Sequence, residues 1–138
     1  MKEFKVPLGE SREIIKQRKE IILDFYREWK RENPEQRVYN RNLKEYIYVK
    51  HISISETAMH ASNRYLSTLA VLQLDGILCG AMKVSQEKVK QNSNQKKFRS
   101  MIIMNYLCPG IGLVKLTVGV EHKTFIKTQY CITAIELE

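Results

Sequence analysis

The chain is poor in the residues on which small secreted proteins and membrane proteins depend. Only three of its 138 residues are cysteine, three are proline and six are glycine. Cys79, Cys108 and Cys131 are widely spaced and form no CxxC pair, which argues against a disulfide framework and predicts reduced, buried thiols. No apolar run is long enough to span a bilayer, and the first residues lack the apolar core of a signal peptide. We therefore expect a cytoplasmic protein that does not interact with membranes.

The motifs of several large enzyme classes are also missing. The sequence contains no Walker, GxGxxG, HExxH, EF-hand or GxSxG pattern. Its three histidines are scattered, and its acidic residues form no recognisable pair for acid–base chemistry. These absences disfavour metal-dependent and acyl-transfer chemistry. We expect neither a bound metal nor a cofactor.

Acidic residues are scarce relative to basic ones. There are 15 Asp and Glu against 23 Lys and Arg, which gives a formal net charge of +8. Basic side chains gathered on one face bind polyanions and release counterions from phosphates. The charge balance therefore points to nucleic acid as a partner.

What the chain has is a strand-rich C-terminal part, residues 98–138. β-branched and aromatic residues dominate there, and turn residues fall in two places, which predicts three strands. In the middle strand Val114, Leu116, Val118 and Val120 alternate with more polar positions, so one face is wholly apolar. The run 101–104 is apolar on both sides and fits a central strand. This pattern predicts an antiparallel sheet with one face open.

Helical patterns precede this sheet. Ser11 is an expected N-cap, and apolar residues recur at helical spacing from there until Asn33 and Pro34 end the run. A strand is expected at 46–49, continuing to about residue 54 after a bulge. Ser53 and Glu56 match a capping box, which predicts a second helix to about residue 65, and a third helix is expected from Ser67 to about residue 81. A short edge strand at 82–84 completes the pattern.

These elements predict one α+β domain over residues 1–138. Its N-terminal helices would pack on a C-terminal antiparallel sheet of three to four strands. The helix at 11–33 stands apart as an added element, which would act either as a brace or as a docking site for a protein partner. The oligomeric state is not indicated by the sequence.

Residues 85–97 form the clearest loop of the chain. Four lysines and the following arginine give it a strong positive charge: Lys88, Lys90, Lys96, Lys97 and Arg99. Two interpretations are open for this loop. It would clamp a nucleic-acid backbone, or it would simply be a flexible connection within a hairpin.

The order of the predicted elements resembles that of a known group of proteins. A helix with a histidine (ETAMHASNRYL), a leucine-rich helix, a polar loop and paired strands reading KLTVGV and YCITAI follow one another. Over residues 46–138 this order resembles the polyvalent-protein domains of phages and other mobile elements. Those domains are grouped with the barnase, EndoU, colicin-nuclease and RelE-like ribonucleases. The resemblance implies a nuclease-like core and metal-independent cleavage, with RNA favoured over DNA as the partner.

The resemblance also implies roles for individual residues. His60 would be the acid–base residue, since an imidazole with an unperturbed pKa of about 6.5 transfers protons near neutral pH. Lys115 would bind the phosphate or stabilise the transition state. Thr117, together with Thr133 or Tyr130, would hold the phosphate or the nucleotide. Each residue also has an ordinary structural explanation, and no second catalytic histidine or strand arginine accompanies them.

The choice between Tyr130 and Thr133 depends on strand register. A three-residue turn at 122–124 would place Lys115 opposite Cys131, so that Thr133 shares its face and Tyr130 points into the core. A two-residue turn at 122–123 would place Tyr130 opposite Lys115 instead. The sequence leaves both registers open. It also leaves open two functions, a small ribonuclease and a non-catalytic module that binds nucleic acid or protein on the same scaffold.

Overall fold

The computed structural model describes residues 3–136. Its helices and strands follow one another along the chain as follows: α1 (Arg12–Glu32), β1 (Arg37–Asn40), β2 (Glu45–Tyr48), α2 (His51–Ala61), α3 (Tyr65–Val71), α4 (Leu74–Gly80), β3 (Met82–Glu87), η1 (Asn94–Lys97), β4 (Ser100–Cys108), β5 (Gly112–Val120) and β6 (Lys127–Ala134). The predicted α+β class is confirmed.

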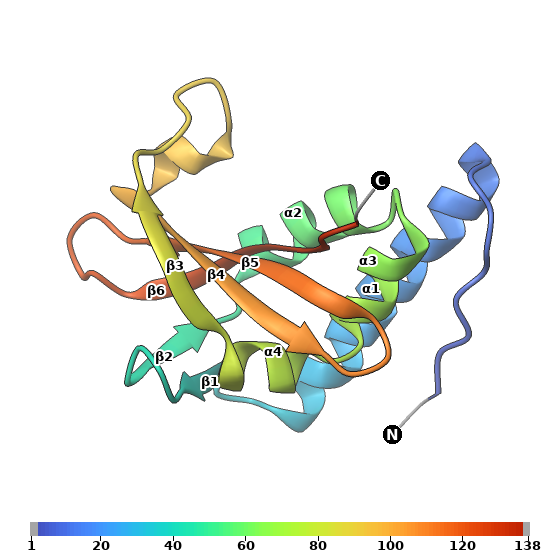
Figure 1. Cartoon of the computed structure of the whole chain (residues 1–138), viewed down its shortest axis with the longest axis horizontal. Helices are drawn as coiled ribbons and strands as arrows, with labels where there is room; N and C mark the ends of the chain where they lie inside the picture. The colour runs from blue at the N-terminus through green and yellow to red at the C-terminus, as the bar shows by residue number, and fades with distance from the viewer. Residues whose placement is uncertain (1–2, 137–138) are drawn as a thin grey trace.

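Six strands form one curled sheet in the order β1-β2-β6-β5-β4-β3 (Figure 1). All neighbouring strands are antiparallel except β2 and β6, which run parallel over a short stretch. The prediction of a purely antiparallel sheet with three to four strands is therefore wrong in detail. The difference arises because β1 and β2, which precede the helices in sequence, add to the same sheet beside β6.

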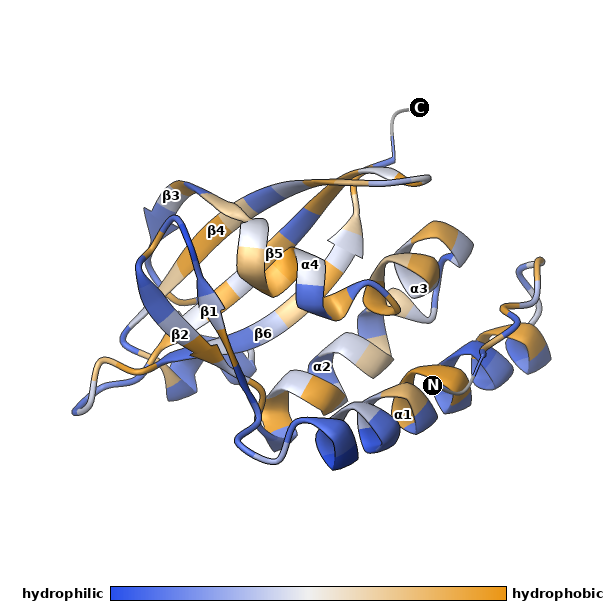
Figure 2. Ribbon diagram, turned by 90° about the horizontal axis from the view of Figure 1, so that it is seen from below, coloured by the Kyte–Doolittle hydropathy of each residue, from blue (hydrophilic) through white to orange (hydrophobic). Residues whose placement is uncertain are grey.

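The helices form two layers on one face of the sheet. Figure 2 shows α2 and α3 between the sheet and α1, which is the outermost element. The apolar face of β5 is buried against these helices, as predicted: Val114, Leu116, Val118 and Val120 are all at most 3% exposed. Burial of a side chain of this size contributes roughly 1.5–3 kcal/mol relative to leaving it in water. Within residues 3–136 no helix layer covers the opposite face of the sheet (Figure 1), and we call it the open face.

Local sequence explains the first helix. The Ser11 hydroxyl accepts a hydrogen bond from the Ile14 backbone N–H at 3.2 Å, so Ser11 is the N-cap that the sequence indicated. On its apolar side, Tyr26 and Trp29 are buried, and Trp29 Nε1 donates to Asp75 of α4 at 2.7 Å. The helix thus joins the outer layer to the inner one.

Three boundary predictions are wrong. The strand expected to continue to residue 54 ends at Tyr48, because α2 begins at His51. The Ser53 hydroxyl accepts the Lys50 backbone N–H at 2.9 Å, so the capping serine lies inside the helix and Glu56 plays no part in the cap. The single helix expected from Ser67 is divided into α3 and α4 by a break at Leu72 and Gln73.

None of the helices within residues 3–136 combines the length and the apolar character that crossing a membrane would require.

Candidate functional site

The open face of the sheet carries the strand residues that were predicted as part of the site. On β5, Lys115 and Thr117 alternate with the buried valines and therefore point away from the helices. Thr133 of β6 lies directly opposite Lys115, and Cys131 lies opposite Thr117. Lys115 is exposed, whereas Thr117 is 7% exposed. These side chains form a shared polar surface across β5 and β6.

Neither predicted register is correct. Lys115 pairs with Thr133 because the connection between β5 and β6 is longer than a tight turn, and it places Phe125 at a φ of 59°. A bulge then shifts the pairing, so that Val118 pairs with Gln129 and Tyr130 is left as the extra residue. Tyr130 and Thr133, which were predicted as alternatives, both lie on the open face.

Helix α2 packs along β6 and reaches both sides of this strand. Thr57 lies on the core side, where its hydroxyl accepts a hydrogen bond from Gln129 Nε2 at 2.7 Å. Glu56, one residue earlier, is turned toward the open face, and its backbone carbonyl is 3.9 Å from Cys131 Sγ. The helix therefore forms a wall beside the polar surface.

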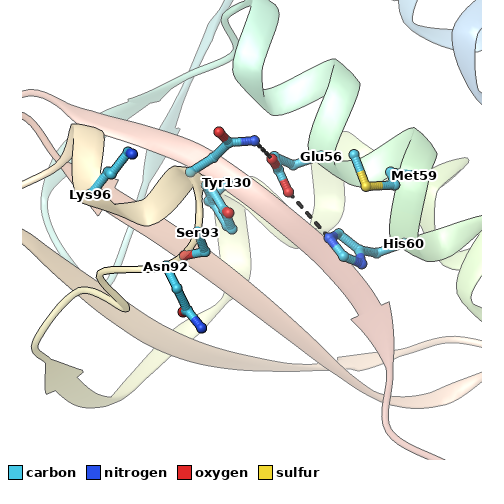
Figure 3. Close-up of a pocket in the computed structure, with 8 residues that line it drawn as sticks. Glu56, Met59, His60, Asn92, Ser93, Lys96 and Tyr130 are labelled. Carbon is cyan, nitrogen blue, oxygen red and sulfur yellow. Dashed lines mark hydrogen bonds and ion pairs between the residues drawn. The ribbon is translucent and has the colours of Figure 1, made fainter.

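A pocket of about 370 Å³ lies between this wall and the basic loop. Glu56, Met59 and His60 line it from α2, and Tyr130 lines it from β6 (Figure 3). Asn92, Ser93, Asn94 and Lys96 line it from the loop. The loop between β3 and β4 thus folds back over the sheet toward α2 and partly encloses the pocket.

A buried carboxylate and an accessible imidazole meet in this pocket. His60 Nε2 lies 3.2 Å from Glu56 Oε2, and the two side chains are 50% and 4% exposed. The other carboxylate oxygen, Oε1, accepts a hydrogen bond from Asn94 Nδ2. The spacing of four residues on one helix brings Glu56 and His60 together, and the contact with Asn94 ties the loop to α2.

Two further groups in or beside this pocket stay protonated at neutral pH. Burial raises the pKa of Tyr130, and together with the nearby Glu56 carboxylate it brings this pKa to about 12. Burial likewise raises the pKa of the Cys131 thiol to about 12, again with a contribution from Glu56. Tyr130 therefore stays a phenol whose hydroxyl has the Glu56 carboxylate as a hydrogen-bond partner, whereas Cys131 is not a thiolate nucleophile.

The structure brings together part of the predicted site. His60, Tyr130 and Lys96 line one pocket. Lys115, Thr117 and Thr133 share the open face but do not line the pocket. The remaining basic residues, Lys88, Lys90, Lys97 and Arg99, are exposed in or next to the loop.

Glu56 was not predicted as a site residue. This glutamate was expected in a helix cap, although ETAMH already places an acid four residues before the histidine. That spacing was the available signal. No sequence signal indicated the contribution of Asn94, because its contact with Glu56 depends on how the loop folds back across the sheet.

Comparison with known protein families, with curated proteins and with solved structures finds no match for this chain. Among residues 3–136, no three or more His, Cys, Asp or Glu side chains gather in a way that would hold a metal ion.

Proposed function

We propose that the protein is a small metal-independent ribonuclease whose reaction centre is the pocket between α2 and the basic loop. The observation that carries this proposal is the contact between the buried Glu56 carboxylate and the half-exposed His60 imidazole. A carboxylate that orients an accessible histidine is a recurrent arrangement for proton transfer. The net charge of +8 supports a polyanionic substrate.

The proposed reaction needs a base and a stabilised phosphate. In this scheme His60 Nε2–H donates a hydrogen bond to the Glu56 carboxylate, which leaves Nδ1 with a free lone pair. Nδ1 takes the proton of the ribose 2′-hydroxyl, and the 2′ oxygen attacks the adjacent phosphorus. The bond from phosphorus to the 5′ oxygen breaks, water protonates that oxygen, and a 2′,3′-cyclic phosphate forms.

Other residues of the pocket assist this step. The Tyr130 hydroxyl, which stays protonated, donates a hydrogen bond to a phosphate oxygen, and Lys96 offsets the developing negative charge. Lys115, Thr117 and Thr133 lie outside the pocket on the open face, so we assign them to the neighbouring phosphate and nucleotide. Glu56 is a positioning residue in this scheme, because it acts through His60.

The test is incubation of the purified protein with total RNA in EDTA. His60→Ala should lower the cleavage rate by about 10²–10⁴-fold, the usual contribution of a general acid–base residue. Glu56→Gln should lower kcat with little change in KM. His51→Ala removes an exposed histidine from the same helix and is the matched control, with no change expected. Intact RNA with the wild type, or equal cleavage by His60→Ala, would contradict the proposal.

A second candidate is a non-catalytic module that binds nucleic acid. One observation favours it: none of the ion pairs found within residues 3–136 involves the four lysines of the basic loop, which are exposed. Free lysines of this kind bind phosphates without regard to sequence. RNA binding that weakens steeply with salt and persists unchanged in His60→Ala, in the absence of any cleavage, would favour this function.

A further inference from the structure

A strip of aromatic and basic side chains lies outside the pocket, on the β1–β2 hairpin and the β5–β6 loop. On the hairpin, Ile47 is buried, so its neighbours Tyr46 and Tyr48 point away from the helices. The antiparallel partners of these tyrosines are Tyr39 and Arg37, which share their face. Tyr39 and Tyr46 are 46% and 42% exposed, so two adjacent rings are open to solvent.

The rings of the hairpin are held in place by their neighbours. Tyr39 and Tyr46 meet edge to face with centroids 5.3 Å apart. The Arg37 guanidinium lies 4.0 Å from the centre of the Tyr46 ring and donates a hydrogen bond to the Tyr48 hydroxyl at 3.1 Å. A guanidinium stacked on a ring in this way extends the flat surface that the ring provides. The hairpin therefore presents a rigid stacking platform.

Phe125, on the loop between β5 and β6, is the second part of the strip. It is 50% exposed and its φ is 59°, a left-handed conformation that is rare for a bulky residue. Backbone hydrogen bonds from Phe125 N to the Glu121 carbonyl and from Glu121 N to the Ile126 carbonyl maintain this conformation. Arg99 lies 4.3 Å from the ring centre. Strain that keeps an apolar ring in water points to a function for that ring.

The two parts of the strip flank one hollow of about 320 Å³. Tyr46 and Tyr48 line it on one side and Phe125 on the other. Figure 1 shows the hairpin, the β5–β6 loop and the basic loop at the same end of the molecule. Tyr48 pairs with Thr128, which precedes Tyr130 of the pocket by two residues on β6. The hollow therefore continues the open face from the pocket toward the hairpin.

We propose that this strip binds single-stranded RNA by stacking unpaired bases on Tyr46, Tyr48 and Phe125. Aromatic rings interleaved with arginine are how proteins hold unstacked bases, and the hollow suits one nucleotide. In a duplex the bases are stacked on one another, so they expose no face on which these rings could stack. Charge supports this occupant: the strip and its surroundings carry Arg37, Lys50, Arg99, Lys123 and Lys127 against the paired carboxylates Glu35, Glu45 and Glu121.

This inference deepens the proposed function and rests on it for the choice of RNA over DNA. If the pocket cleaves RNA, the strip holds the nucleotides beside the cleaved bond and makes the enzyme specific for single strands. Binding itself does not depend on cleavage. The two proposals can therefore fail separately.

The test measures fluorescence anisotropy of a short, labelled, unstructured RNA in EDTA. The protein carries His60→Ala throughout, so that the probe stays intact. Tyr46→Leu and Phe125→Leu keep apolar bulk but remove the ring, and each should weaken binding about tenfold. Tyr65→Leu is the matched control on α3, away from the strip (Figure 1), and should have no effect. Circular dichroism confirms that each variant is folded.

Three competitors define the ligand. The same RNA without label should displace the probe, whereas its duplex and the corresponding single-stranded DNA should compete poorly. Unchanged affinity in both Tyr46→Leu and Phe125→Leu, or equal competition by the duplex, would overturn the assignment of the strip. DNA that competes as well as RNA would overturn the choice of RNA.

Cleavage assays then separate this inference from the proposed function. Wild-type protein that binds the single strand through Tyr46 and Phe125 without cutting it would refute the ribonuclease and leave the strip standing. Cleavage of single strands and duplexes at equal rates, undiminished in Tyr46→Leu and Phe125→Leu, would refute RNA binding by the strip. The ribonuclease proposal would be unaffected.

Discussion

Replacing Gly119 by alanine tests how the basic loop is fastened to the sheet. Gly119 lies on the open face of β5, and the Phe98 ring, at the end of the loop, lies directly over it. A Cβ at this position would come within 2.5 Å of Cγ and Cδ1 of Phe98 and within 2.6 Å of Cδ2. Normal contacts between such carbons are about 3.5–4 Å, so the ring would have to move by roughly 1 Å.

The cost of this movement follows from what holds Phe98. Its ring is 4% exposed and packs edge to face on Tyr130 with centroids 6.1 Å apart. Overpacking at such a site costs typically 1–3 kcal/mol. We expect Gly119→Ala to lower the free energy of unfolding by about 2 kcal/mol in urea titrations. RNA cleavage should fall as well, because the movement would disturb Tyr130 and the loop that encloses the pocket.

A double-mutant cycle with Phe98→Ala identifies the cause. Without the ring the three closest contacts of the new methyl group are gone, and alanine in a strand is favoured over glycine by about 0.5–1 kcal/mol. In the Phe98→Ala background Gly119→Ala should therefore be neutral or slightly stabilising. Equal destabilisation in both backgrounds would show that the ring is not the obstacle and would refute the reasoning.

Two further predictions concern stability. The buried Arg18 guanidinium donates to four backbone carbonyls at 2.8–3.3 Å, so Arg18→Met should cost about 3 kcal/mol in urea unfolding; the exposed Arg12→Met on the same helix is the control, and equal losses would contradict the role of Arg18. The pKa of Cys131 is raised from 9.0 to about 12 by burial and by Glu56. The protonated thiol therefore stabilises the folded state fully below pH 9, and this contribution is lost as the pH rises toward 12. In that interval the free energy of unfolding should fall by up to about 1.4 kcal/mol per pH unit more in the wild type than in Cys131→Ala, and parallel pH profiles would count against it.

The strongest periodic signals of the sequence were sufficient for part of the fold. Alternation on β5 correctly predicted which residues face the core, and Ser11 marked the start of α1. Strand β2 was predicted at 46–49, but its hairpin partner β1 was not recognised, because four residues carry too little periodicity to distinguish a strand from a connector. The parallel pairing of β2 with β6 joins residues about 80 positions apart and leaves no local trace.

The candidate site was predictable only where its residues lie on one element. Glu56 and His60 are four residues apart on α2, so helical geometry alone brings them into contact. The contact of Asn94 with Glu56 depends on the path of a loop with no regular pattern. The aromatic strip depends likewise on the unrecognised hairpin and on the left-handed conformation of Phe125.

The long β5–β6 connection already moves the pairing away from both predicted registers, and the bulge in β6 moves it by one residue more and lets the pocket form. Gln129 and Ile132 are both buried on the core side, where Gln129 donates to Tyr26 and Ile132 pairs with Leu116. Residues three apart face opposite sides of a regular strand, so an extra residue must lie between them. That residue is Tyr130, and it can join Cys131 on the open side only because the strand is irregular there. A regular strand would have turned toward the core either Tyr130, which lines the pocket, or Cys131 and Thr133, which form the polar surface beside it.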